Sequence, residues 1–453
     1  MGRLFGTDGA RGVAVTELTC ETAMQIGRAA AAVLCSKTGH RPKVVIGKDT
    51  RISSDIMEAA LTAGLLSVGA DVVTLGTVPT PAVAYLVRDM KADAGVMISA
   101  SHNSMEFNGI KLFAGNGYKL ADDIEEEIEG YVLDRPEELL DLQKSGADVG
   151  RLTHLRDISD RYAEHVRNTA DVDGSTLRIA LDCANGSASA TAERIFGGTG
   201  SKVYLINCDP DGVNINDRCG STHLDRLVEF VRENKCDVGF AFDGDADRCL
   251  AVDNEGNIVD GDKLIAIFAK DMNEHGSLVK GTAVVTVMTN LGFTFFAKEN
   301  GIKMCTTKVG DRYIVEQMLA EGYNMGGEQS GHIIFHDFAT TGDGQLTAVQ
   351  VLGIMKRTGK SLKELASIME RYPQVMVNVK IEPDLKEQWK NIPEIEDIIN
   401  EKEAELNGKG RILVRESGTE PLIRVMIEGK EFDVINDMAL EIADVIRAYC
   451  RQV

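Results

Sequence analysis

The sequence predicts an α/β protein of three successive mixed or parallel α/β domains and a smaller C-terminal α+β domain around a central cleft. Helical and strand periods alternate along the first third of the chain, and the same alternation starts again twice further on. After Tyr372-Pro373 the pattern changes to closely spaced strands. Strands separated by helices predict mainly parallel sheets covered on both faces, and 453 residues exceed what one core usually holds.

The first domain is placed at residues 1–153. We expect helices over 19–35 and 54–68 and strands over 44–47, 72–75 and 96–99. Asp55 and Glu58 predict a capping box at the start of the second helix. The acidic, turn-rich stretch 122–156 predicts a peripheral helix and then a connection to the next domain.

Three further domains are placed at residues 154–254, 255–371 and 372–453. The second contains predicted strands over 179–182 and 238–242, and the third a helix over 263–271 and a strand over 283–287. The fourth contains strands over 375–381, 412–414 and 422–427 and a terminal amphipathic helix. We interpret the apolar side of that helix as a core face; it comprises Ile435, Met438, Ile442, Val445, Ile446 and Tyr449.

Charge and cysteine content exclude several classes of protein. A formal net charge of -21 argues against nucleic-acid and anionic-membrane partners, which need basic patches. The nine cysteines are scattered and form no C-x-x-C pair, so we expect buried, reduced thiols rather than disulfides or a zinc site. No signal-peptide pattern and no apolar stretch of about twenty residues is found, which predicts a cytoplasmic protein.

Two polar segments follow predicted strands, where ligands of α/β folds usually bind. Ser99-Ala100-Ser101-His102-Asn103 offers hydroxyl nucleophiles, although alone it is more typical of a turn. We expect no dyad of Ser101 and His102, because neighbours in an extended chain point to opposite sides. The second segment carries carboxylates at Asp243, Asp245 and Asp247. Three clustered negative charges favour binding of a hard divalent cation, and a solvated acidic turn is the alternative. An EF-hand is not indicated, because the segment lacks the glycine at the sixth position and the carboxylate at the twelfth position of such a loop.

Two glycine-containing segments complete the set. Gly326 to His332 allows close approach of a ligand and offers hydrogen-bonding groups at Glu328, Ser330 and His332. The segment 415–420, with Arg424 beyond it, combines guanidinium groups, hydroxyls and backbone N–H groups into a candidate phosphate cradle. Each segment alone is equally compatible with an ordinary turn or hairpin.

Together, the four segments resemble the phosphohexomutases of the α-D-phosphohexomutase superfamily. The resemblance implies that Ser101 carries a phosphoryl group and, with the three aspartates, binds one Mg²⁺. It also implies that Glu328, Ser330 and His332 contact the sugar, and that the substrate phosphate is held by Arg415, Ser417, Gly418, Thr419 and Arg424. Arg11, in F-G-T-D-G-A-R-G, and a sugar-distinguishing loop with Lys308, Gly310 and Asp311 match as well.

Gln329 and the segment 214–223 resemble the phosphoglucosamine branch of that family. The implied activity is the interconversion of glucosamine 6-phosphate and glucosamine 1-phosphate through phosphoserine and a hexose 1,6-bisphosphate, feeding UDP-N-acetylglucosamine synthesis. Arg11 and Arg248 would stabilise the transferred group, Lys111 or His332 would move the proton, and the domains would close over the substrate. A homodimer is compatible with this reading.

One departure and three alternatives accompany the resemblance. Ser104 stands where the family usually has proline, which predicts a looser serine loop. The alternatives are a mutase for glucose or mannose phosphates, a magnesium-dependent sugar phosphatase, and a catalytically silent sugar-phosphate binding protein.

Overall fold

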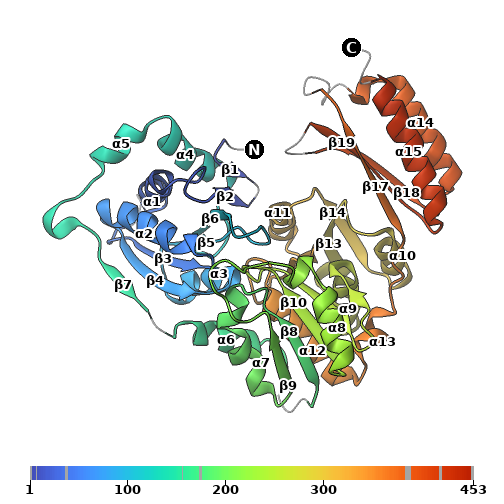
Figure 1. Cartoon of the computed structure of the whole chain (residues 1–453), viewed down its shortest axis with the longest axis horizontal. Coiled ribbons are helices and arrows are strands. Elements are labelled where there is room, and N and C mark those ends of the chain that lie inside the picture. The colour runs from blue at the N-terminus through green and yellow to red at the C-terminus, as the bar shows by residue number, and fades with distance from the viewer. Residues whose placement is uncertain are drawn as a thin grey trace. The chain divides into compact units, whose positions relative to one another are not determined.

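The computed structural model describes residues 3–6, 8–35, 39–155, 157–172, 176–382, 389–417 and 421–449. The chain divides into two compact units, Met1–Met288 with Ile302–Ile368, and Thr289–Gly301 with Met369–Val453. Three sheets flanked by helices lie in the first unit, and a three-stranded sheet lies in the second (Figure 1). The predicted class, three α/β domains and a smaller C-terminal domain, is confirmed.

The first sheet has seven strands. Its order is β1 (Phe5–Gly6), β2 (Gly9–Val13), β6 (Phe107–Ala114), β5 (Ala94–Ile98), β3 (Lys43–Lys48), β4 (Asp71–Thr77) and β7 (Leu152–His154). Of these, β5, β3, β4 and β7 are parallel, and β1, β2 and β6 form an antiparallel part on one side. Its helices are α1 (Cys20–Cys35), α2 (Ser53–Ser67), α3 (Thr80–Asp89), α4 (Asp122–Leu133) and α5 (Pro136–Asp141).

Both faces of this sheet are covered, as predicted. Val44 and Ile46 share a core with α1 and α2, whereas a Cβ at Gly47 would lie 2.5 Å from Val83 of α3. The predicted capping box is wrong, because α2 has no side-chain cap and Lys48 Nζ instead binds the carboxylates of Asp55 and Glu58 at 2.8 and 2.5 Å.

The second and third sheets each place a hairpin beside parallel strands. The second has the order β12 (Ile258–Val259), β11 (Cys249–Asp253), β10 (Val238–Phe242), β8 (Arg178–Asp182) and β9 (Lys202–Ile206), with helices α6 (Ser159–Arg167), α7 (Ala192–Phe196) and α8 (Asp225–Glu233). The third has the order β14 (Lys303–Thr307), β13 (Thr282–Thr286), β15 (Met325–Gly327) and β16 (Ile333–Phe335), with α9 (Gly261–Glu274), α11 (Asp311–Glu321), α12 (Gly344–Thr358) and α13 (Leu362–Ala366). The β10–β11 turn contains the three aspartates, and the β15–β16 turn contains Glu328 and Ser330.

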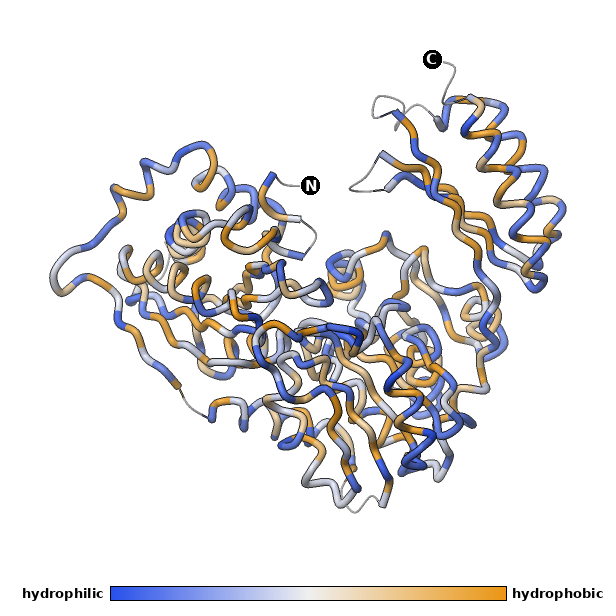
Figure 2. The backbone as a smooth tube through the Cα atoms, in the orientation of Figure 1, coloured by the Kyte–Doolittle hydropathy of each residue, from blue (hydrophilic) through white to orange (hydrophobic). Residues whose placement is uncertain are grey.

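The second unit packs an antiparallel sheet against helices. The order is β17 (Gln374–Lys380), β19 (Leu422–Glu428) and β18 (Arg411–Glu416), accompanied by α10 (Leu291–Glu299), α14 (Pro393–Leu406) and α15 (Phe432–Tyr449). Apolar and polar residues alternate along α15 (Figure 2). The predicted core face is confirmed for Ile435, Met438, Ile442 and Ile446, which are buried, whereas Val445 and Tyr449 are only partly buried.

The cysteines whose side chains the structure describes are free thiols. Cys183, Cys219, Cys236 and Cys249 are buried, whereas Cys20, Cys208 and Cys305 are partly exposed, so the expectation of burial holds for only part of the set. Within the described ranges, no helix has the length and apolar character needed to cross a membrane.

Candidate active site

Ser101 lies in the turn that follows β5, and it is fully buried. Its backbone is left-handed, with φ of +52°, which is uncommon for a residue with a side chain. The hydroxyl donates a hydrogen bond to Asp243 Oδ2 at 2.7 Å. The first sheet therefore delivers the predicted nucleophile to the aspartate turn of the second sheet.

His102 contacts Ser101, which we had not expected. Ser101 Oγ lies 3.4 Å from His102 Nδ1, because the left-handed turn at Ser101 ends the alternation of an extended chain. The same nitrogen faces Arg248 Nη1 at 3.1 Å and must accept from it. Burial lowers the pKa of His102 to about 4, and the cations of Arg248 and Arg11 act in the same direction. His102 is therefore a weak base for this hydroxyl.

The aspartate turn is buried, so the alternative of a solvated acidic turn is wrong. Asp243, Asp245 and Asp247 are at most 2% exposed, and one oxygen from each lies within 4.8 Å of the others. Burial and repulsion from the other two carboxylates raise the pKa of Asp243. Burial also acts to raise the pKa of Asp247, but Lys111 and His332 outweigh it and hold that pKa below its usual value.

The donor set of this turn fits a divalent cation. Asp245 Oδ1 and Asp247 Oδ1 are buried and have no hydrogen-bond partner among the described residues. Buried carboxylate oxygens without donors are costly unless a cation neutralises them, and hard divalent ions prefer oxygen ligands. In the described part of the chain, no other group of three or more His, Cys, Asp or Glu side chains has this geometry. The oxygens of these three aspartates suit a divalent metal cofactor.

Lys111 on β6 supplies a buried positive charge beside the aspartates. Its Nζ lies 2.7 Å from Asp245 Oδ2, 3.4 Å from Asp247 Oδ2 and 3.0 Å from Asp8 Oδ2. Burial alone would lower the pKa of Lys111, but these carboxylates raise it above its usual value. Lys111 is thus firmly protonated. Arg11 on β2 also binds Asp8.

His332 connects the aspartate turn to the third sheet. Its Nδ1 lies 3.6 Å from Asp247 Oδ1, and its Nε2 lies 3.5 Å from Asp311 Oδ2. Those carboxylates raise the pKa of His332, against the effect of burial. Nε2 nevertheless accepts a hydrogen bond from the backbone N–H of Gly342 at 3.0 Å. Because an accepting nitrogen carries no proton, the His332 ring in this geometry is neutral and has its proton on Nδ1.

The predicted sugar loops meet through Gly310 and Glu328. The N–H of Gly310 donates to Glu328 Oε1 at 3.1 Å, and the φ of +128° at Gly310 is a conformation that favours glycine. Asp311, the next residue, binds Lys119 of the first domain. Lys308 and Ser330 are exposed on the same loops, and Lys308 Nζ lies 5.8 Å from the centre of the Tyr313 ring.

The candidate phosphate cradle lies in the second unit. Arg415 on β18 is directly opposite Arg424 on β19, and Arg424 Nη2 lies 3.4 Å from Ser417 Oγ. Burial and the neighbouring Arg424 lower the pKa of Arg415. Two like charges directly opposite each other destabilise a sheet, and an anion between them relieves this repulsion. Gly418 and Thr419, predicted for the same cradle, lie outside the described residues.

Sequence reasoning missed three residues at this site. Thr80, at the start of α3, donates its hydroxyl to Asp245 Oδ2 at 2.6 Å and its N–H to Asp245 O at 2.9 Å. It closely follows β4, so the strand-end signal that marked Ser101 also applied to it. Lys119 carries no such signal, because its partners are distant in sequence. Asp8 lies in the quoted F-G-T-D-G-A-R-G segment, where only Arg11 was given a role, and its contacts with Lys111 and Lys119 are distant in sequence.

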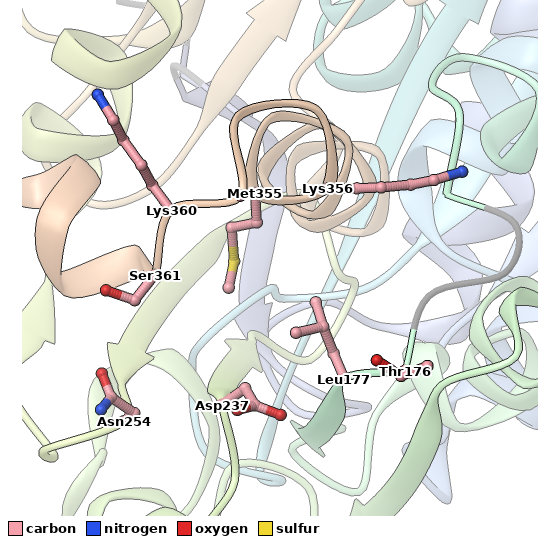
Figure 3. A pocket seen from close by; sticks show the side chains of 9 residues that line it. Thr176, Leu177, Asp237, Asn254, Met355, Lys356, Lys360 and Ser361 are labelled. Carbon is pink, nitrogen blue, oxygen red and sulfur yellow. The ribbon is translucent and has the colours of Figure 1, made fainter.

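A separate cavity of about 410 Å³ lies elsewhere in the first unit (Figure 3). Its lining includes Thr176 and Asp237, which come just before β8 and β10, and Ser361 at the start of α13. The N-terminal ends of β8 and β10 lie at one end of the sheet, and the aspartate turn lies at the other end. The cavity is therefore distinct from the cluster around Ser101.

Comparison with known proteins places the whole chain among related enzymes. The phosphoglucomutase/phosphomannomutase models match as alpha/beta/alpha domain I over residues 2–138, domain II over 160–256, domain III over 260–372, and the C-terminal domain over 376–445. A phosphoglucosamine mutase of Clostridium perfringens is 53% identical over 450 residues, which cover 99% of this chain and 100% of the relative. One from Acetivibrio thermocellus is 52% identical over 446 residues, covering 98% and 99%. A crystal structure of a phosphoglucomutase/phosphomannomutase family protein from Burkholderia thailandensis has a TM-score of 0.80 at 22% identity, covering 98% of this chain and 97% of that one.

Proposed function

The chain belongs to the phosphoglucomutase/phosphomannomutase family, and from this premise we propose that it is an isomerase that interconverts glucosamine 6-phosphate and glucosamine 1-phosphate. The relatives that are about half identical over nearly the full chain are phosphoglucosamine mutases, which supports this substrate over glucose or mannose phosphates. The reaction is an intramolecular phosphoryl transfer.

The observation that carries this proposal is the 2.7 Å contact between the Ser101 hydroxyl and Asp243. A phosphoryl group on Ser101 would add about two negative charges next to three buried carboxylates. Such an arrangement needs neutralising charge. Arg248 and Lys111 lie among the same carboxylates, and the aspartate oxygens suit a divalent ion.

We infer that this ion is Mg²⁺, held by Asp243, Asp245, Asp247 and a phosphoryl oxygen on Ser101. When bound, Mg²⁺ would withdraw charge from the transferred group. Hard carboxylate oxygens without nitrogen or sulfur donors favour it over softer metals. Arg11 and Arg248 would stabilise the remaining charge on the equatorial oxygens.

In the forward reaction, the bond between phosphorus and Ser101 Oγ breaks as a bond forms to O1 of glucosamine 6-phosphate. The resulting hexose 1,6-bisphosphate turns around, and its 6-phosphoryl group returns to Ser101. The proton of the attacking hydroxyl must leave in each half. His332 is better suited than Lys111 to move it, because three carboxylates hold Lys111 in its charged form.

Other predicted residues bind the substrate. We propose that Glu328 and Ser330, with Lys308, Gly310 and Asp311, contact the sugar. We propose that Arg415, Ser417, Gly418, Thr419 and Arg424 bind the phosphate that is not reacting. We also infer a cytoplasmic location, which the free thiols of the described cysteines support because reducing compartments keep thiols unpaired.

Two measurements test the proposal. Intact-protein mass spectrometry, after incubation with a hexose 1,6-bisphosphate, should show a phosphoryl mass in the wild type that Ser101→Ala lacks. A coupled assay should give a higher kcat/KM for glucosamine 6-phosphate than for glucose or mannose 6-phosphate. The absence of the phosphoryl mass refutes the carrier role. Preference for another hexose refutes the substrate, and release of free phosphate without isomerisation indicates a phosphatase.

A further inference from the structure

The backbone of the Ser101 turn is gathered around one buried guanidinium group. Arg51, in the turn between β3 and α2, is 2% exposed. Its Nη2 donates to the carbonyls of Ser101 and Asn103 at 3.0 and 2.8 Å. Its Nη1 donates to Phe107 O at 3.1 Å and also to Ser104 O. One side chain thus binds four carbonyls within residues 101–107.

Arg51 is itself held in place by Asp49, the residue that follows β3. Asp49 Oδ2 accepts from Arg51 Nε at 2.8 Å and from Ser99 Oγ at 2.7 Å. Ser99 Oγ in turn accepts the N–H of Ser101 at 3.0 Å. Both the amide and the carbonyl of Ser101 are therefore held through the Asp49–Arg51 pair.

A second donor comes from another domain. Asn216, between β9 and α8 of the second domain, is 9% exposed, and its Nδ2 donates to Ser101 O and Asn103 O, each at 2.9 Å. Asn216 belongs to the segment 214–223, which resembles the phosphoglucosamine branch and to which the sequence analysis gave no role. The carbonyl of Ser101 consequently receives two side-chain donors, one from each of the first two domains.

This arrangement accounts for two features of the turn. Ser101 has a left-handed backbone, which an ordinary residue adopts only when its surroundings impose it. Ser104 also replaces the proline that we expected to stiffen the turn. Six hydrogen bonds from Arg51 and Asn216 to the carbonyls of Ser101, Asn103, Ser104 and Phe107 supply that restraint instead.

We propose that Arg51 and Asn216 are positioning residues that clamp the Ser101 turn and hold the phosphoryl carrier in line with its acceptor. The inference rests on the proposed function of Ser101. Neither side chain hydrogen-bonds to the Ser101 hydroxyl; both bind its backbone carbonyl. Loss of the clamp should therefore slow transfer without weakening substrate binding.

Asn216 offers the cleaner test, because replacing Arg51 leaves Asp49 buried without its partner and endangers folding. Asn216→Gly removes both donors while tolerating the φ of +58° at that position. Asn216→Asp keeps the size of the side chain but presents an acceptor to two carbonyls. The matched control is Asn407→Gly, an exposed residue with φ of +47° at the end of α14 in the second unit. Arg51→Lys keeps the charge but loses the fork of donors.

We expect kcat to fall about 10- to 100-fold in Asn216→Gly and further in Asn216→Asp, with KM for glucosamine 6-phosphate changed less than about twofold. Hydrogen exchange of the 101–107 amides should rise in both variants, while Asn407→Gly should match the wild type. Unchanged kcat and unchanged exchange in the Asn216 variants overturn the clamp, as does a rise in KM at constant kcat. If the wild type shows no mutase activity, the proposed function is refuted but the clamp is not. The clamp is then tested by the hydrogen exchange of the 101–107 amides.

Discussion

Asp343 provides a quantitative test of how burial controls charge near the site. It caps the start of α12, where its Oδ1 accepts the N–H of Leu346 at 2.9 Å, and both of its oxygens lie 2.9 Å from the hydroxyl of Tyr162 on α6. Burial raises the pKa of Asp343 to about 7 from its ordinary value of 3.8. Asp343→Asn keeps an acceptor for Leu346 and imitates the protonated form.

The difference between these pKa values, about three units, corresponds to about 4 kcal/mol of stability. Between pH 4 and 7 the folded carboxyl keeps a proton that the unfolded chain has released. Its stabilising contribution is therefore complete below about pH 4 and is lost as the pH rises through about 7. Asparagine does not titrate, so the stability of the variant relative to the wild type should rise with pH. About 3 kcal/mol of that change should fall between pH 5 and 8.

The assay is urea denaturation followed by far-UV circular dichroism from pH 5 to pH 8, because the single tryptophan, Trp389, lies in the second unit and would not report on α12. Asp55→Asn is the control, since the Asp55 side chain is 80% exposed. A difference between Asp343→Asn and wild type that stays constant with pH would show that the buried carboxyl is ionised throughout, and the reasoning from burial would be refuted.

Two further predictions concern the cradle and the metal. Arg415→Ala should raise KM for glucosamine 6-phosphate at least about tenfold, because it removes a guanidinium group from the phosphate cradle. The urea midpoint of Trp389 fluorescence should stay unchanged or rise, because the substitution removes a like charge opposite Arg424. An unchanged KM contradicts the cradle. Chelation with EDTA should abolish mutase activity, and added Mg²⁺ should restore it, whereas Asp245→Asn should require a higher Mg²⁺ concentration for half-maximal activity. Full activity after chelation would contradict the metal assignment.

The fold and the aspartate turn were predictable because their signals are local. Strand β10 spans the same residues as its prediction, since an uninterrupted apolar run ends abruptly at Asp243. Three carboxylates at alternate positions have few structural explanations other than a cation. The terminal helix was equally clear, because its apolar residues recur at helical spacing over 18 residues.

What could not be predicted depends on partners far apart in sequence. Asp8 meets Lys111 and Lys119 only because β2 and β6 are neighbours in the first sheet. The predicted capping box failed for a different reason, since Lys48 is only seven residues from Asp55: the lysine binds the carboxylates of Asp55 and Glu58 across a turn, and an ion pair replaces the local motif. Spacing along the chain reveals the chemistry that a segment offers, but it does not reveal which distant group will use it.

The surroundings of Ser101 favour a carrier over a base-activated nucleophile. His102 is close enough to accept its proton, but Arg248 occupies the ring nitrogen and the pKa of about 4 makes His102 a weak base. Lys111 is held in its charged form by three carboxylates. The hydroxyl instead donates to Asp243, in a cluster whose orphaned oxygens call for a cation. In the proposed cycle Ser101 therefore acts as a carrier that gives its phosphoryl group to O1 and takes one back from the bisphosphate, so the enzyme must receive a phosphoryl group before its first turnover.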